Sequence, residues 1–175
     1  MSLDGICDHT VLMADDEIHQ HYNDLLKSAG ILVYGRITYQ LMESYWPTVV
    51  KNPTGNKPID EFAVIIEDIP KIVFSHTLES VDWKNARLAR KDLEEEILQL
   101  KQQTGNDVLV GSRSLIITLL NLNLVDEFQL CVQPIIAGSG MRLFEKINDR
   151  IQFKLVKTKT LSSSGSLVLY YEPLR

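Results

Sequence analysis

Short apolar strands alternate with amphipathic helices from residue 15 to residue 122 of this 175-residue chain. The run Ile31–Tyr34 contains no charged residue, which is typical of a strand buried on both faces of a parallel sheet. The predicted strands are 31–34, 71–74, a short one near 88, and 108–110; the predicted helices are 15–27, 37–45, 59–66, 93–103 and 114–122. This alternation predicts an α/β fold with a largely parallel sheet and helices on both of its faces.

Glycine and proline residues mark where several of these elements are expected to end. Gly30 is predicted to stop the first helix. The second helix is predicted to end before Pro47, because proline removes a helical hydrogen bond. Residues 51–58 are predicted to form a loop, and Gly105 is predicted to follow the fourth helix.

The chain beyond residue 124 has a different pattern. Three β-rich runs cover residues 125–137, 151–161 and 166–171, and residues 162–165 resemble a hairpin loop. We expect these runs to form antiparallel strands added at one edge of the parallel sheet. No linker or low-complexity segment interrupts the sequence, so we expect a single domain over residues 1–175.

Charge and composition argue against several classes of protein. The chain has 18 basic and 23 acidic residues, a net charge of −5, so we expect no binding to nucleic acid. No apolar stretch approaches the roughly 18 residues of a membrane span and no signal-peptide pattern opens the chain, so we expect a cytoplasmic protein that does not bind membranes. Its two cysteines, Cys7 and Cys131, lie in no metal-ligand spacing and fit a reducing compartment.

Three predicted strands end in glycine or small polar residues. Because ligands bind beyond the carboxyl ends of parallel strands, and helix N-termini bind phosphate, these ends are candidate cofactor-binding residues. They are Gly35, Arg36 and Thr38 after the first strand, Ser75, His76 and Thr77 after the second, and Gly111, Ser112, Arg113 and Ser114 after the strand at 108–110. Each group alone also fits a plain turn or a helix cap. Together they favour a dinucleotide that lies across several strands.

Other chemistries lack their motifs. A complete G-x-G-x-x-G and a Walker lysine are missing, which argues against the common dinucleotide fold and against P-loop hydrolysis. The sequence has no H-x-E with C-x-x-C, no G-x-S-x-G and no H-E-x-x-H, which excludes a zinc nucleoside deaminase and argues against the other two classes. His9, His19 and His21 form a loose cluster for which metal binding is the alternative, but we expect surface or substrate-pocket histidines and no metal site.

Ordered motifs along nearly the whole chain resemble one known family. They are Ser2–Gly5, Tyr34–Tyr39, Lys71–Leu78 with Trp83 and Asn85, Val110–Ser112, Leu124–Glu127, and Pro134–Gly140 leading to Leu143-Phe144. As a series they resemble the reductase domain of the bacterial riboflavin-biosynthesis deaminase–reductase and its stand-alone, dihydrofolate reductase-like relatives.

The resemblance implies a dihydrofolate reductase-like three-layer α/β/α fold, NADPH as hydride donor, a small heteroaromatic or pterin-like substrate, and a homodimer. It places the cofactor phosphates at Gly35, Arg36 and Thr38 and the pyrophosphate at Gly111, Ser112, Arg113 and Ser114. Ser75, His76 and Thr77 would lie near the 2′-phosphate. A non-catalytic NADPH-binding regulatory protein and a dimeric interaction module are the alternatives.

The resemblance also bears on the catalytic residues. Asp4 and Gly5 would lie beside the nicotinamide and the substrate. A carboxylate of the first helix would bind the substrate, and among its four acids we expect Glu17 and Asp24 to face inward. In the family an apolar strand precedes the Ser2–Gly5 motif, whereas here Met1 directly abuts it. Either the chain begins unusually late or it lacks a native first strand, and we expect the latter.

Overall fold

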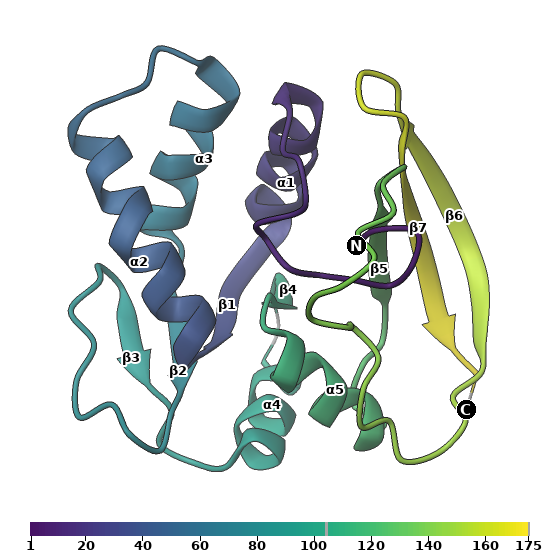
Figure 1. The fold of residues 1–175 in the computed structure, drawn as a ribbon. Coiled ribbons are helices and arrows are strands. Elements are labelled where there is room, and N and C mark those ends of the chain that lie inside the picture. Colours follow the sequence, from purple (N-terminus) through teal and green to yellow (C-terminus); the bar gives the residue numbers. More distant parts are fainter. Residues whose placement is uncertain (104, 175) are drawn as a thin grey trace. The chain divides into compact units, whose positions relative to one another are not determined.

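The structure is a computed structural model that describes residues 1–103 and 105–174, and it is an α/β protein (Figure 1). The chain forms two compact units. The parallel unit is His19–Ile116, and the antiparallel unit is Met1–Ile18 together with the chain from Ile117 onward. The expectation of a single domain over residues 1–175 stays a prediction. None of the described helices is long and apolar enough to cross a membrane.

The parallel unit contains a four-stranded sheet in the order β3-β2-β1-β4, in which all neighbours are parallel. Its strands are β1 (Ala29–Gly35), β2 (Lys71–Phe74), β3 (Ala86–Leu88) and β4 (Asp107–Val110). The helices in chain order are α1 (Asp16–Ser28), α2 (Arg36–Lys51), α3 (Lys57–Asp68), α4 (Leu93–Lys101) and α5 (Arg113–Asn121). Along the sequence, the boundaries between the two units fall within α1, after Ile18, and within α5, after Ile116.

Both faces of the central strands are buried, as the apolar run in β1 predicts. Leu32 and Tyr34 of β1 and Val73 of β2 belong to a hydrophobic cluster that includes residues of α1, α2 and α3. Val33 and Ile72 are register partners on the opposite face, and both are fully buried. Alternate residues therefore point to opposite faces and neither face is left to solvent.

Helix α2 continues through Pro47, so the prediction that it ends before this residue is wrong. Proline lacks the amide that would bond to the carbonyl four residues earlier, and its ring crowds that carbonyl. Packing on both sides of the proline holds the helix together. The ring of Trp46 lies 4.4 Å from that of Phe62 in α3, and Val49 is buried. Tertiary contacts here outweigh the local preference.

Two other boundaries differ from the prediction. Gly30 does not stop a helix: α1 ends at Ser28, and Gly30 lies inside β1. The strand can begin this early because β1 pairs with β4 from Ala29 onward, with an irregularity before Ile31. The predicted loop 51–58 shrinks to residues 52–56, because Asn56 caps α3 by accepting a hydrogen bond from the amide of Ile59.

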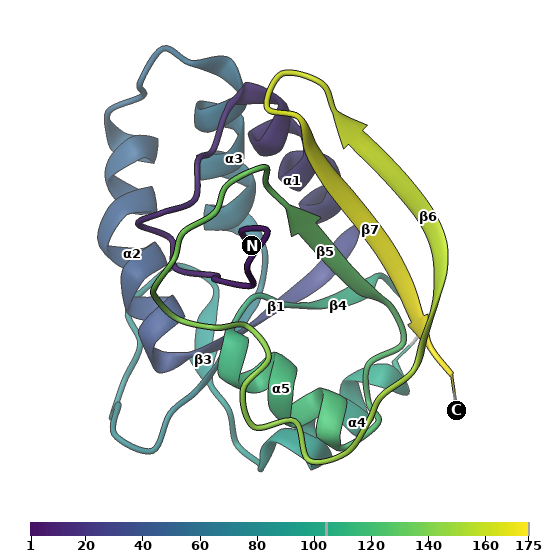
Figure 2. The same cartoon turned by 45° about the vertical axis from the view of Figure 1, so that its right-hand side comes forward.

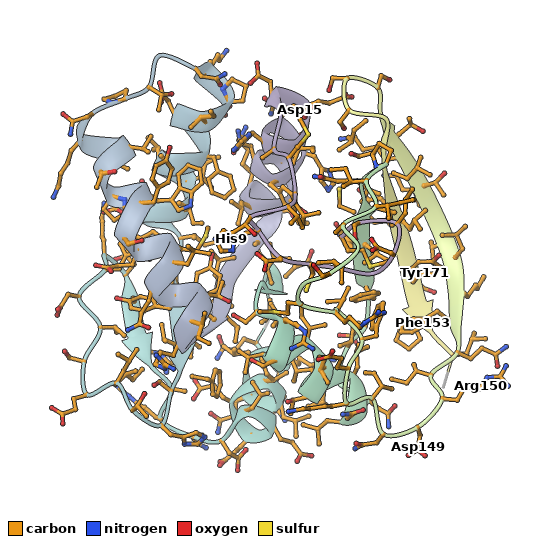
Figure 3. The ribbon with its side chains drawn as sticks, in the orientation of Figure 1. His9, Asp15, Asp149, Arg150, Phe153 and Tyr171 are labelled. Atoms are coloured by element: carbon orange, nitrogen blue, oxygen red, sulfur yellow. The ribbon has the colours of Figure 1, made fainter. Side chains whose placement is uncertain are left out.

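The antiparallel unit contains a separate sheet of β5 (Phe128–Val132), β6 (Phe153–Leu161) and β7 (Ser166–Pro173), in the order β5-β7-β6 (Figure 2). The hairpin at 162–165 is confirmed. The expectation that these strands extend the parallel sheet is wrong, because they pair among themselves instead. Phe153 and Tyr171, labelled in Figure 3, lie side by side with ring centroids 6.0 Å apart.

A buried lysine stands at the amino end of β2. Lys71 is 1% exposed, and its ammonium group donates hydrogen bonds to the carbonyls of Glu67 (3.0 Å), Ile69 (2.9 Å) and Lys84 (3.0 Å). The same group lies 4.4 Å from the centre of the Trp83 ring. Burial disfavours the charged form and lowers the pKa of Lys71 to about 8.

The lowered pKa of Lys71 predicts a pH dependence of stability. Below pH 8 the folded and unfolded states are both protonated at this residue, and the cost of burying the charge is fully present. Between pH 8 and 10.5 the unfolded state binds more protons, so the free energy of unfolding rises with pH, by at most about 3 kcal/mol. Denaturant titrations should show this rise for the wild type relative to Lys71→Met.

The exposed Lys84, which pairs with Asp68, provides the control. Its pKa is raised by the carboxylate of Asp68, so the wild type should show no rise relative to Lys84→Met over the same pH range. Parallel pH curves for the wild type and Lys71→Met would contradict the assignment.

Candidate functional site

The parallel pairing brings the predicted cofactor-binding residues to one edge of the sheet. Gly35, the last residue of β1, is the register partner of Phe74, the last residue of β2, and Val33 of β1 pairs with Val110 of β4. All ten predicted residues lie at or just beyond these carboxyl ends. They are Gly35, Arg36, Thr38, Ser75, His76, Thr77, Gly111, Ser112, Arg113 and Ser114.

A buried hydrogen bond ties two of these strand ends together. The amide of Gly35 donates to the hydroxyl of Ser112, at 2.8 Å, and Ser112 is 2% exposed. Helix α2 begins one residue after Gly35, and helix α5 begins one residue after Ser112. The hydrogen bond therefore fixes two helix N-termini next to each other at the same edge of the sheet.

The N-terminus of α2 is open to an anion. Its cap residue is Gly35, which makes no side-chain cap, and its first turn has no acidic residue. The first amides of a helix lack partners inside the helix, and the helix dipole adds partial positive charge there. Arg36 is exposed, with its guanidinium 3.2 Å from the side-chain oxygen of Gln40, and Thr38 is half-buried. These groups together can hold phosphate.

The glycine after β4 lies against a buried ring that leaves little space for a side chain. A Cβ atom at Gly111 would lie 3.0 Å from Cε1 of Tyr34. Tyr34 is 4% exposed, and its burial raises the pKa of its hydroxyl above the ordinary value, so the side chain stays neutral. The absence of a side chain at Gly111 thus lets the backbone after β4 lie directly against the β1 tyrosine, next to the Gly35–Ser112 bond.

The residues after β2 form a capped turn. The hydroxyl of Ser75 accepts hydrogen bonds from the amides of Thr77 (3.1 Å) and Leu78 (2.9 Å). The Ser75 hydroxyl therefore caps its own turn, as the alternative interpretation of this segment predicts. His76 and Thr77 are exposed at the tip of the turn, where they can meet a ligand.

Asp4 holds a loop of the antiparallel unit. Its carboxylate accepts hydrogen bonds from the amides of Ala137 (3.0 Å) and Gly138 (2.7 Å) and from the hydroxyl of Ser2 (2.7 Å). These donors stabilise the ionised form and lower the pKa of Asp4 to about 2, with the Ala137 amide the largest cause. Gly138 has a φ of +75°, a conformation that favours glycine.

The two predicted acids of α1 lie in different settings. Glu17 accepts hydrogen bonds from the amide (2.8 Å) and hydroxyl (2.9 Å) of Ser163, in the β6–β7 turn, and these bonds lower its pKa. The same hydroxyl lies 2.6 Å from the carboxylate of Asp15, which is labelled in Figure 3, so the two acids share its one proton. Asp24 is exposed and accepts a hydrogen bond from Gln20, so the expectation that it faces inward is wrong. Its position on α1 follows the helical period, which places it on the solvent side.

The histidines have separate surroundings. His9, labelled in Figure 3, is exposed near Asp8, whereas His19 packs edge-on against the rings of Trp46 and Phe62. His21 is 5% exposed. Within residues 1–103 and 105–174, no group of three or more His, Cys, Asp or Glu side chains could hold a metal ion.

Sequence and structure comparisons decide the family. A family model described as the RibD C-terminal domain matches residues 1–165. This chain is a RibD C-terminal domain. It is 34% identical to protein YyaP of Bacillus subtilis (strain 168) over 151 residues, which cover 86% of this chain and 78% of YyaP.

Solved structures confirm the dihydrofolate reductase-like α/β fold. A protein from Shewanella sp. PV-4, assigned to riboflavin biosynthesis, matches with a TM-score of 0.72 and 22% identity, over 99% of this chain and 95% of its own. A diaminohydroxyphosphoribosylaminopyrimidine deaminase/5-amino-6-(5-phosphoribosylamino)uracil reductase from Thermotoga maritima matches with a TM-score of 0.64 and 17% identity. That match covers 99% of this chain and 54% of the Thermotoga chain.

Two features of this RibD C-terminal domain escape sequence reasoning. The amides of Ala137 and Gly138 meet Asp4 from more than 130 residues away, and no local pattern indicates this. Arg90 follows β3 at the same edge of the sheet as the cofactor candidates. The predicted strand near Leu88 is the sequence feature that could have indicated Arg90, since the carboxyl end of that strand also belongs to a parallel sheet.

The Asp4 contacts predict a change in local protection for the RibD C-terminal domain. In Asp4→Asn one acceptor oxygen is replaced by an NH₂ group, which cannot accept from a backbone amide. Hydrogen exchange at Ala137 and Gly138 should become faster. In the wild type the protection should persist down to about pH 4, the ordinary range of an aspartate, and be lost as pH falls toward 2.

The matched control is Asp8→Asn in the same segment, because the Asp8 carboxylate accepts its hydrogen bonds from the amide and hydroxyl of Thr10. It should leave exchange at Ala137 and Gly138 unchanged. Equal protection of these two amides in the wild type and Asp4→Asn would refute the role of Asp4.

The contact between Gly111 and Tyr34 predicts a steric cost. Gly111→Ala should lower the free energy of unfolding by roughly 1–3 kcal/mol, because the added methyl group meets a buried ring. Gly35→Ala is the control, since its Cβ would lie 3.7 Å from Ser112 and Ser114, an ordinary contact distance. Denaturant midpoints should separate the two variants, and equal losses would contradict the packing argument.

Proposed function

We propose that this RibD C-terminal domain is an NADPH-dependent reductase that transfers a hydride to a small heteroaromatic or pterin-like substrate, of the riboflavin-precursor or dihydrofolate type. Membership of the family supports a reductase. The Thermotoga protein, whose name includes a 5-amino-6-(5-phosphoribosylamino)uracil reductase, shares the fold. We further propose a cytoplasmic homodimer with no nucleic-acid partner.

The observation that carries the proposal is the pair of helix N-termini joined by Gly35 and Ser112. The amide-to-hydroxyl bond places the starts of α2 and α5 at adjacent strand ends. A diphosphate has two negatively charged groups, and two neighbouring helix N-termini supply partial positive charge for both. The space left by Gly35, where a Cβ would have no neighbour nearer than 3.7 Å, fits a close approach of the cofactor.

Residues at three strand ends would each bind a different part of the cofactor. Gly35, Arg36 and Thr38 would hold phosphate at the start of α2, and Gly111, Ser112, Arg113 and Ser114 would receive the pyrophosphate at the start of α5. Ser75, His76 and Thr77 would lie near the 2′-phosphate. When bound, NADPH supplies the hydride, while the protein binds and orients the reactants.

The carboxylates fit an orienting role better than a proton-donating one. Hydrogen bonds lower the pKa of Asp4 to about 2 and also lower the pKa of Glu17, so both are ionised near neutral pH. An ionised carboxylate can accept hydrogen bonds from a substrate, but it has no proton to give. We propose Asp4 as the residue that positions the 137–140 loop, and Glu17 as the acid of α1 available to a substrate.

The ionised carboxylates also favour a second candidate, a non-catalytic NADPH-binding protein. Such a protein would keep the phosphate contacts and lack an oriented acid. Oxidation of bound NADPH in the presence of pyrimidine or pterin substrates distinguishes the two, because only the reductase consumes the cofactor. A plain interaction module would bind neither nucleotide.

Titration of the protein with NADPH and NADH, followed by nucleotide fluorescence or calorimetry, tests the proposal. We expect a Kd for NADPH on the order of 1 μM, which corresponds to about −8 kcal/mol, and clearly weaker binding of NADH. Arg36→Ala should weaken NADPH binding by roughly tenfold, because it removes a positive charge beside the α2 N-terminus.

The control is Lys84→Ala, which removes an exposed charge just before β3, at the amino edge of the sheet. Its affinity for NADPH should equal that of the wild type. A wild-type protein that binds neither nucleotide would refute the proposed function.

A further inference from the structure

Arg90 lies at the carboxyl edge of the parallel sheet, one strand beyond the Ser75–Thr77 turn. Strand β3 pairs in parallel with β2, with Val73 opposite Leu88, and the amide of Ala89 donates to the carbonyl of Val73 at 2.9 Å. The chain therefore leaves β3 at the edge where β2 ends. Arg90 follows at once, and its position is a consequence of the sheet register.

The backbone of Arg90 is held while its side chain is exposed. Its amide donates to the carboxylate of Glu96 in α4, at 3.3 Å. The neighbouring basic groups are engaged, since Arg87 pairs with Glu96 and Lys91 pairs with Glu95. In the part of the chain that the structure describes, the exposed guanidinium of Arg90 makes no hydrogen bond or ion pair.

The turn after β2 offers a ligand little permanent charge of its own. The Ser75 hydroxyl is used as an acceptor by the amides of Thr77 and Leu78. His76 and Thr77 are exposed, and neither carries the fixed charge of a guanidinium. A doubly charged phosphate over this turn needs cations from the neighbouring strands.

The strand order places one arginine on each side of the turn after β2. In the order β3-β2-β1, the turn after β2 lies between Arg90, which follows β3, and Arg36, which follows β1. Strands in a sheet are about 4.8 Å apart, so β3 lies roughly 10 Å from β1 and further from β4. In the order β3-β2-β1-β4, Arg90 is thus two strand spacings from the start of α2 and three from β4, which precedes α5, so it lies toward the opposite end of a dinucleotide whose pyrophosphate is at β1 and β4.

We propose that Arg90 binds the 2′-phosphate of the adenosine end of NADPH, across the Ser75–Thr77 turn from Arg36, and that it determines the preference for NADPH over NADH. This inference rests on the proposed function, in which the pyrophosphate lies at β1 and β4. Guanidinium groups bind phosphate through paired N–H donors, which suits a terminal phosphate with three free oxygens.

Arg90→Gln, titrated with NADPH and with NADH, tests this role. NADPH affinity should fall by tenfold or more, while NADH affinity stays within twofold of the wild type. Adenosine 2′,5′-bisphosphate should lose affinity in the same way, and 5′-AMP should not. Arg90→Lys should restore part of the NADPH affinity, because it keeps the charge without the planar fork.

Lys91→Gln is the matched control, because it makes the same change in net charge one residue away at a side chain that is paired with Glu95. It should leave the ratio of NADPH to NADH affinity unchanged, and unfolding midpoints should show that both variants fold. If Arg90→Gln lowers the affinities for NADPH and NADH equally, or changes neither, the role of Arg90 is overturned while the proposed function stands. If the wild type binds neither nucleotide, both proposals are overturned.

Discussion

The hydrogen bond from the amide of Gly35 to the hydroxyl of Ser112 is the interaction on which the candidate site depends. Both groups are buried, and a buried amide without a partner would cost about 1–3 kcal/mol. The bond satisfies that amide and at the same time sets the distance between the starts of α2 and α5. Beside it, the ring of Tyr34 lies so near Gly111 that a side chain at position 111 would crowd the two strand ends.

Much of the parallel unit could be predicted because its signals are local. Pro70 and the apolar run that follows indicate β2 with its observed bounds, and the strand-end glycines identify the candidate cofactor-binding edge. The course of α2 beyond Pro47 could not be predicted, since Trp46 and Val49 hold the helix through contacts with other elements. The separate antiparallel sheet was missed for a related reason, because periodicity identifies strands without identifying their partners.

The candidate site shows the same division. The ten candidate cofactor-binding residues follow directly from where three strands end, and the parallel register then brings them together. The carboxylates are different, because their chemistry depends on distant donors. Asp4 meets the amide of Gly138, and Glu17 meets Ser163, in each case across more than 130 residues of sequence. Arg90 needed the strand order before its place at the edge could be recognised.

The surroundings of Lys71 also determine how the protein responds to amine-directed chemistry. Its nitrogen is enclosed by three carbonyl groups and an indole ring, and the side chain is 1% exposed. Acylating reagents and trypsin, which act readily on surface lysines, can reach this one only when the parallel unit opens. Labelling at Lys71 therefore reports on the opening of the sheet, and the exposed Lys84 supplies the reference rate in the same molecule.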